Sequence, residues 1–317
     1  WLMIVGSPVA FAGQPLDPDT LPDMTIGLAG VPYYASALPF ANVLLLESRG
    51  WRFADTGAQV PVSELDTNGF PVALAGRTVF AQPFQNNGLQ PAYPVGRYTI
   101  TWQGDGDVTI ASANATLVEG SSALRRRVYV VSAASGSGLR IELTGANAPD
   151  HVHHVRVWAP DPADPQQQSL EPPAGTREQQ IHPSYIEHLT ETPGLFGVIR
   201  FMDWGSTNAS PQVEWSHRRP PEHAFASGAR TYKELITPGT TNSLGDIGVP
   251  YERMIETANA AGMDAWICIP HAASDDYVRN LARLFRYGSD QSGAVYTSPQ
   301  ADPYHPPLLG NLRLWRS

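Results

Sequence analysis

The spacing of the hydrophobic residues changes between residues 150 and 180, and this change constrains the fold more than any other feature of the sequence. Before it, short apolar segments alternate with polar residues; residues 97–102 (RYTITW) are the clearest case. That period of two is typical of half-buried strands. After the change, apolar residues recur three and four positions apart, as on one face of a helix. The sequence therefore predicts an all-β part followed by an α/β part.

The first part, residues 13–150, is predicted to be a β-sandwich. The turn residues Gly104 to Asp107 separate 97–102 from a second apolar stretch at 108–110, which predicts a hairpin. Regularly spaced short strands are typical of a sandwich. Residues 159–176, rich in Pro, Gln and Asp, are predicted to be a loop or linker. Further strands are predicted at 78–81, 127–132 and 139–143.

The second part, residues 151–317, is predicted to alternate helices with short buried strands. Tyr251, Met254, Ile255 and Ala258 form an amphipathic stripe. Such alternation indicates a parallel sheet with helical crossovers. Helices are predicted at 181–192, at 249–262 and from Ser274 to about Gly288, and strands at 197–204 (GVIRFMDW) and 264–270.

Charge and hydropathy exclude two classes of partner. The 317 residues carry a formal net charge of −9. The one basic cluster, at 125–127, leads into an apolar strand and is interpreted as solvated surface, so we expect no nucleic-acid partner. No segment has the length of a membrane span, so we expect no membrane partner. An acidic surface is compatible with a neutral polymer such as a polysaccharide.

The first residues predict secretion. Residues 1–12 (WLMIVGSPVAFA) form a short apolar stretch that ends in a small-x-small pattern. We interpret them as the remnant of a signal peptide, which places the protein outside the cell or in the periplasm. An ordinary buried strand is the alternative. The single cysteine, Cys268, lies in an apolar run and is interpreted as a buried structural thiol.

Three stretches resemble a group of secreted bacterial glycoside-hydrolase-like proteins. They are YPVGRYTITWQGDGDV at 93–108, GVIRFMDWGSTN at 197–208 and GVPYERMIETANAAGMDAWICIPHAASDDYVRNLAR at 248–283. In these cellulase-like proteins a β-sandwich precedes a clan-A (β/α)8 barrel. The resemblance implies a protein that acts on, or binds, a polysaccharide such as a β-glycan.

The resemblance also implies a barrel register. It makes 153–159 strand one, 197–204 strand two and 264–270 strand three, with strand four beginning near residues 311–315. Strand four of such families carries an Asn-Glu pair, and a later strand carries the second carboxylate. This sequence has no Asn-Glu pair. We therefore expect an incomplete barrel, catalytic carboxylates beyond residue 317, and self-association through an open sheet edge. The alternative is a non-catalytic secreted carbohydrate-binding or scaffold protein.

Candidate site residues follow from the same register, because barrel active sites lie where the strands end. The catalytic residues themselves are unknown. Asp203 is expected to bond a sugar hydroxyl or to cap a loop. Trp204 is expected to stack on a sugar ring or to fill the core. His271 is expected to bond a sugar or to make a structural hydrogen bond. The long loop that follows Trp204 adds Asn208, Trp215, His217 and Arg218 as candidates.

Two polar clusters invite a metal interpretation that we do not favour. His151 and His153 would share one face of a strand, but neither His154 nor any other residue supplies a third ligand at a convincing spacing. Turn formation explains the acidic cluster as well as calcium binding does. We therefore expect neither a metal nor another cofactor. The acidic cluster consists of Asp66, Asn68, Asp105 and Asp107.

Overall fold

The computed structural model describes residues 24–35, 37–85, 93–145, 149–208, 210–228 and 247–316. The chain forms two compact units that are interleaved along the sequence. The antiparallel unit comprises residues 31–180 and 222–246, and the parallel unit comprises residues 1–30, 181–221 and 247–317. The sequence alone predicts a single boundary at residue 150. The fold is mixed, with antiparallel sheets, a parallel sheet and few helices.

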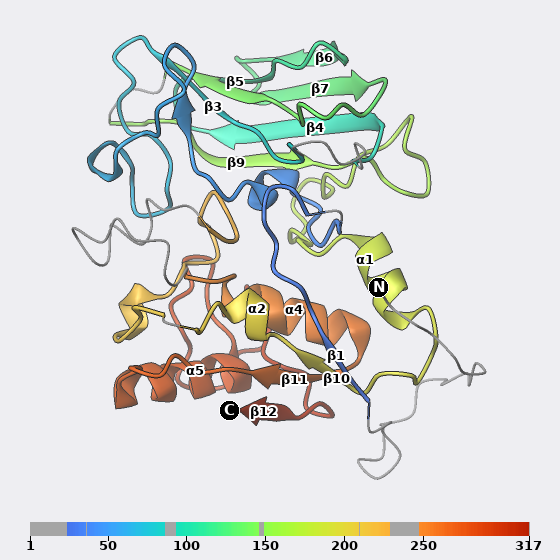
Figure 1. Cartoon of the computed structure of the whole chain (residues 1–317), viewed down its shortest axis with the longest axis vertical. Helices are drawn as coiled ribbons and strands as arrows, with labels where there is room; N and C mark the ends of the chain where they lie inside the picture. Colours follow the sequence, from blue (N-terminus) through green and yellow to red (C-terminus); the bar gives the residue numbers. More distant parts are fainter. Residues whose placement is uncertain are drawn as a thin grey trace. The chain divides into compact units, whose positions relative to one another are not determined.

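The antiparallel unit contains two four-stranded sheets (Figure 1). In both, every strand pairs with its neighbours in antiparallel orientation. One has the order β2 (Arg52–Phe53), β3 (Thr78–Ala81), β8 (Ile141–Thr144), β5 (Asp107–Ile110). The other has the order β6 (Ala115–Ser121), β7 (Arg126–Val131), β4 (Gly96–Gln103), β9 (His153–Trp158). Short 3-10 helices cover Val43–Leu46 (η2) and Val62–Glu64 (η3).

The side chains that form the core of this unit alternate along the strands, as predicted. Tyr98, Ile100 and Trp102 of β4 are buried, as are Val108 and Ile110 of β5. Neighbouring residues on the opposite face include half-exposed polar side chains such as those of Arg97 and Thr101. The predicted strands at 78–81, 97–102, 108–110, 127–132 and 139–143 are confirmed to within two residues at each end.

The interpretation of residues 153–159 as the first strand of a barrel is wrong. These residues form β9, which pairs antiparallel with β4, so that Trp158 lies opposite Thr99. The alternation of a strand specifies which face is buried but not which strand is its partner. The strand that pairs with the next parallel strand is instead β1 (Thr25–Gly27), far upstream in the sequence.

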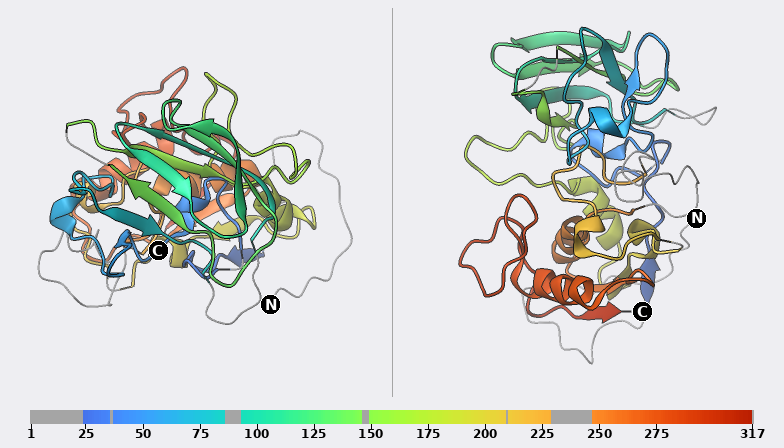
Figure 2. Two further views of the ribbon diagram at one scale, coloured as in Figure 1. Left: turned by 90° about the horizontal axis from the view of Figure 1, so that it is seen from above. Right: turned by 90° about the vertical axis from the view of Figure 1, so that its left-hand side faces the viewer.

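The parallel unit contains one four-stranded parallel sheet, in the order β1, β10 (Val198–Arg200), β11 (Asp264–Ile267), β12 (Leu314–Arg316). This spatial order is the order of the strands along the chain (Figures 1 and 2). The helices are α1 (Pro183–Thr190), α2 (Met202–Gly205), α4 (Tyr251–Ala261) and α5 (Asp275–Tyr287), with a 3-10 turn η4 at Trp215–His217. The predicted parallel sheet with helices between its strands is confirmed.

Local sequence explains where the two long helices begin and end. The buried face of α4 includes the predicted stripe, and Gly262 ends the helix in the left-handed region, at φ +66. Ser274 caps the start of α5: its Oγ accepts a hydrogen bond from the backbone N–H of Tyr277 at 3.2 Å. In the part of the chain that the structure describes, no helix has the length and apolar character needed to span a bilayer.

The strand predicted at 197–204 is shorter than expected. It ends at Arg200, because Phe201 leaves extended geometry, with φ −95 and ψ 30. The backbone N–H of Gly205 then donates to the carbonyl of Phe201 at 2.8 Å, which closes the turn of α2. Residues 202–205 are therefore helical, and their side chains do not continue the alternation of the strand.

Candidate functional site

The candidate residues near the ends of β10 and β11 differ in their exposure to solvent. Asp203, Asn208 and His271 are exposed. Trp204 is buried, with 1% of its surface exposed, and its ring packs against Tyr185 and Phe201. The expectation that its indole stacks on a sugar is therefore corrected: the helical turn of α2 directs Trp204 into the core.

Trp215 is half-buried and belongs to an aromatic cluster with the first turns of α4 and α5. Its ring lies parallel to that of Tyr251, with centroids 6.3 Å apart, and meets the ring of Tyr277 edge-on at 5.3 Å. The guanidinium carbon of Arg218 lies 4.4 Å from its centroid. The structure thus brings together two of the predicted loop residues, Trp215 and Arg218.

Buried hydrogen bonds fix this cluster. Arg218 donates from both Nη atoms to the carboxylate of Glu252, at 2.9 Å each. The hydroxyl of Tyr277 lies 2.9 Å from that of Tyr251 and donates to Gln212 Oε1 at 3.0 Å. Burial raises the pKa of Tyr251 to about 12. These contacts join the segment 210–221 to α4 and α5.

The space behind the cluster is too small for a sugar. A cavity of about 10 Å³ is lined by Gln212, Arg218, Tyr251 and their neighbours. A cavity of that volume holds about one water molecule. This cavity therefore does not accommodate a sugar ring.

The second face of the parallel sheet is more open than this cavity. Arg200, Trp266 and Trp315 occupy one register row across three adjacent strands, and we call them the Arg200 row. Neighbours in a strand point to opposite faces. Ile199 and Ala265, on the other face, have no exposed surface. The Arg200 row is open by comparison, because Arg200 and Trp266 are half-buried and 45% of the surface of Trp315 is exposed.

Several contacts position the side chains of the Arg200 row. The guanidinium carbon of Arg200 lies 4.9 Å from the ring centroid of Trp266. Arg200 Nε is buried and has no hydrogen-bond partner among the described residues. The nitrogen edge of the Trp315 indole is fixed by a hydrogen bond, which Nε1 donates to Asp264 Oδ2 at 2.9 Å. The guanidinium carbon of Arg313 lies 5.3 Å from the ring centroid of Trp315. An indole ring can pack against the apolar face of a sugar ring, and a guanidinium can donate hydrogen bonds to its hydroxyls.

Sequence reasoning missed the Arg200 row. The available signal was an arginine inside the apolar strand GVIR and a tryptophan in each of the two later strands. The three residues are neighbours because of the pairing between their strands, and the local sequence of each strand does not determine that pairing.

The acidic cluster is explained by turns and ion pairs. Asp66 Oδ1 accepts from the backbone N–H groups of Asn68 and Phe70, both at 2.8 Å. Asp105 pairs with Arg125 at 2.9 Å, and Asp107 Oδ2 accepts from an arginine of β7 at 2.7 Å. Across the described ranges, no three or more His, Cys, Asp or Glu side chains are arranged to hold a metal ion. Cys268, the one cysteine of the sequence, is a buried thiol.

No protein-family model matches this chain, and comparison with curated proteins and with solved structures gives no significant match either. The site is therefore interpreted from its residues and geometry.

Proposed function

We propose that the chain is part of a secreted, glycosidase-type protein that binds a polysaccharide, such as a β-glycan, at the open face of its parallel sheet. The observation that carries the proposal is the Arg200 row, which presents two indoles and one guanidinium side by side. Aromatic faces beside a cationic donor are suited to sugars, which combine apolar ring faces with hydroxyl groups.

The strand order supports the architecture that this proposal requires. In a (β/α)8 barrel, successive parallel strands are neighbours and helices connect them. The order β1, β10, β11, β12 is compatible with the first four strands of such a barrel. The Arg200 row would then face the barrel interior, with Arg200 at the C-terminal end of its strand, where barrel active sites lie. The antiparallel unit, proposed to be a β-sandwich, would be inserted between strands one and two.

In this proposal, glycoside hydrolysis depends on carboxylates from a later part of the protein. Both retaining and inverting glycosidases use two carboxyl groups that flank the scissile bond. The Arg200 row would position the glycan, and the later strands would supply the acid and the nucleophile or base. Secretion rests on residues 1–12, which lie outside the described residues, and it remains a proposal.

A second candidate function is non-catalytic carbohydrate binding. The chemistry of the Arg200 row favours it, since indole and guanidinium groups bind a sugar but supply neither a general acid nor a carboxylate nucleophile. Both candidates share the same binding surface. They differ in whether the gene continues into an Asn-Glu segment, which sequencing the source DNA past codon 317 would establish.

Glycan binding by the purified chain tests the shared part of the proposal. Affinity electrophoresis against soluble β-glucan, xylan and mannan would identify the glycan that is bound. We expect Trp266→Ala and Trp315→Ala each to weaken that binding about fivefold, because each stacking contact contributes about 1 kcal/mol. Tyr34→Ala, which removes an exposed aromatic ring of the antiparallel unit, is the matched control. Binding that persists in the double tryptophan variant would refute the assignment.

A further inference from the structure

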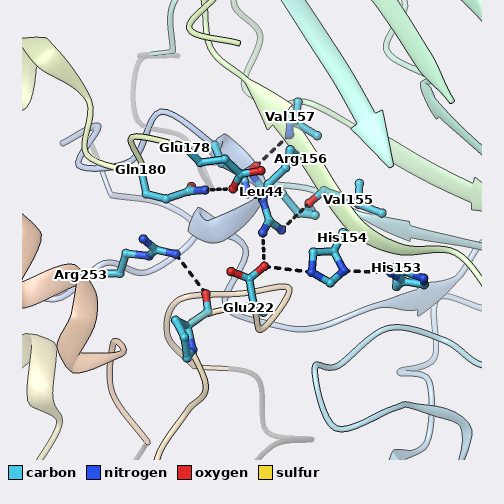
Figure 3. A network of polar contacts seen from close by, with 12 residues as sticks. Leu44, His153, His154, Val155, Arg156, Val157, Glu178, Gln180, Glu222 and Arg253 are labelled. Carbon is cyan, nitrogen blue, oxygen red and sulfur yellow. Dashed lines mark hydrogen bonds and ion pairs between the residues drawn. The ribbon is translucent and has the colours of Figure 1, made fainter. Parts of the chain in front are cut away.

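Strand β9 contains a bulge at its histidines. Thr101 pairs with Arg156, whereas Gln103, two residues later, pairs with His153, so β9 carries one extra residue. His154 lies in this bulge and has φ +48, in the left-handed region that residues other than glycine rarely adopt. Neighbours in a regular strand point apart. Here the rings of His153 and His154 converge instead, and their Nδ1 atoms lie 2.9 Å apart (Figure 3).

A buried carboxylate sets the tautomer of one ring. Glu222 Oε2 lies 3.2 Å from His154 Nε2, and 5% of the Glu222 side chain is exposed. The same oxygen accepts from Nη2 of Arg156 and therefore serves as an acceptor here. The neutral ring of His154 consequently carries its proton on Nε2 and a lone pair on Nδ1, aimed at His153. A carboxylate behind an imidazole is a common support for a metal-ligating histidine.

The spacing of the two Nδ1 atoms suits two ligands of one metal ion. Metal–nitrogen bonds to imidazole are about 2.0–2.1 Å long, so two such bonds at a right angle place their nitrogens about 2.9 Å apart. Right-angled nitrogen ligands are typical of square-planar or tetragonal copper(II) and nickel(II). A tetrahedral zinc site would separate the nitrogens further. Both side chains are about one-quarter exposed, so an ion reaches them from solvent.

We propose that His153 and His154 bind a copper(II) ion through their Nδ1 atoms, with water molecules in the remaining coordination positions. The site rests on two nitrogens, which is compatible with the finding that no three ligands are already arranged around one point in the described residues. His151 forms one wall, with its ring centroid 5.8 Å from that of His153 and its Nε2 held 2.9 Å from Asp66 Oδ2. Binding replaces the hydrogen bond between the two Nδ1 atoms: the proton of the neutral His153 ring moves from Nδ1 to Nε2 by exchange with solvent, so both rings bind as neutral imidazoles without net proton release.

Copper titration of the full chain tests the site, with calorimetry for affinity and electron paramagnetic resonance for the ligands. We expect nitrogen hyperfine coupling from two imidazoles. His153→Gln and His154→Asn should each weaken copper binding at least tenfold, since the loss of even a supporting residue typically costs about 10–100-fold. Asparagine tolerates a positive φ, so His154→Asn is the variant most compatible with the bulge. Thermal unfolding establishes that each variant is folded.

His188→Gln is the matched control, because His188 is an exposed histidine in α1. It should leave both affinity and spectrum unchanged. Glu222→Gln should weaken binding without removing the nitrogen coupling. Three results would overturn the proposal: wild-type affinity in the double variant His153→Gln/His154→Asn, equal loss in His188→Gln, or a copper spectrum without nitrogen coupling, which would show adventitious surface binding only.

Discussion

Asp264 shows how one buried carboxylate can join two strands. It begins β11 and has no exposed surface. Its Oδ1 accepts from the backbone N–H of Arg313 at 2.7 Å, and its Oδ2 accepts from Arg313 Nε at 3.0 Å and from Trp315 Nε1 at 2.9 Å. All three donors belong to β12 or to the residue before it. The position of Trp315 in the Arg200 row therefore depends on Asp264.

We expect Asp264→Ala to lower the free energy of unfolding by about 1–3 kcal/mol, since it leaves donors without their acceptor. The loss should fall towards the lower end because the Arg313 side chain is 44% exposed and water replaces part of the interaction. Urea unfolding followed by tryptophan fluorescence measures the change. Asp276→Ala, which removes an exposed ion pair, should change stability by less than about 1 kcal/mol. Equal effects of the two substitutions would contradict this role of Asp264.

Tyr251 predicts an alkaline limit to stability. Burial raises its pKa to about 12, above the ordinary value near 10 that it has in the unfolded chain. The contribution from its neutral form is fully present below about pH 10 and is lost as the pH rises towards 12, which amounts to about 2–3 kcal/mol. Tyr251→Phe should flatten the dependence of unfolding free energy on pH in this window. If the pH dependence of the unfolding free energy were unchanged in Tyr251→Phe, the ionisation that limits stability would belong to another group.

At the scale of elements, local patterns predicted most strands and helices but not their partners. Helices α4 and α5 were predictable because their stripes and caps lie within a few residues. Strand β1 was missed because three residues carry no measurable period. Strand β9 was assigned to the wrong sheet, and the Arg200 row went unnoticed, because both depend on pairing between distant segments. Trp204 was expected at a strand end, whereas a helical turn at Met202 directs it inward.

The end of α4 offers a test of this local reasoning. Gly262 has φ +66, and a Cβ built on it would meet nothing within 4 Å. Gly262→Ala should therefore cost about 1 kcal/mol through backbone strain alone. Gly310→Ala is the control, since that glycine also has free space but no positive φ. Thermal unfolding of the two variants measures the difference, and equal stability would contradict the strain argument.

At the scale of the whole molecule, the two units differ in how their strands are covered. The antiparallel unit buries large residues from both of its sheets, among them Tyr98, Val128 and Leu143. In the parallel sheet, β1 and β12 are the two edge strands among the described residues, and Leu314 and Trp315 of β12 are 39% and 45% exposed. An exposed apolar edge strand is a template for pairing with another chain.

We therefore expect the 317-residue chain to self-associate. Sedimentation velocity across a range of concentrations should show a reversible increase in mass. Leu314→Lys should reduce the association, because charge on an edge strand opposes pairing. Leu124→Lys, at an exposed leucine of the antiparallel unit, is the control. A monomer at every concentration would show that the edge of β12 is not an association surface.

The central claim is that the Arg200 row binds a glycan, and a crystal of the chain soaked with a β-linked oligosaccharide tests it most directly. The account predicts a sugar ring stacked on Trp266 or Trp315, with a hydroxyl within hydrogen-bond distance of the Arg200 guanidinium. An oligosaccharide bound only to the antiparallel unit, or not bound at saturating concentration, would contradict it.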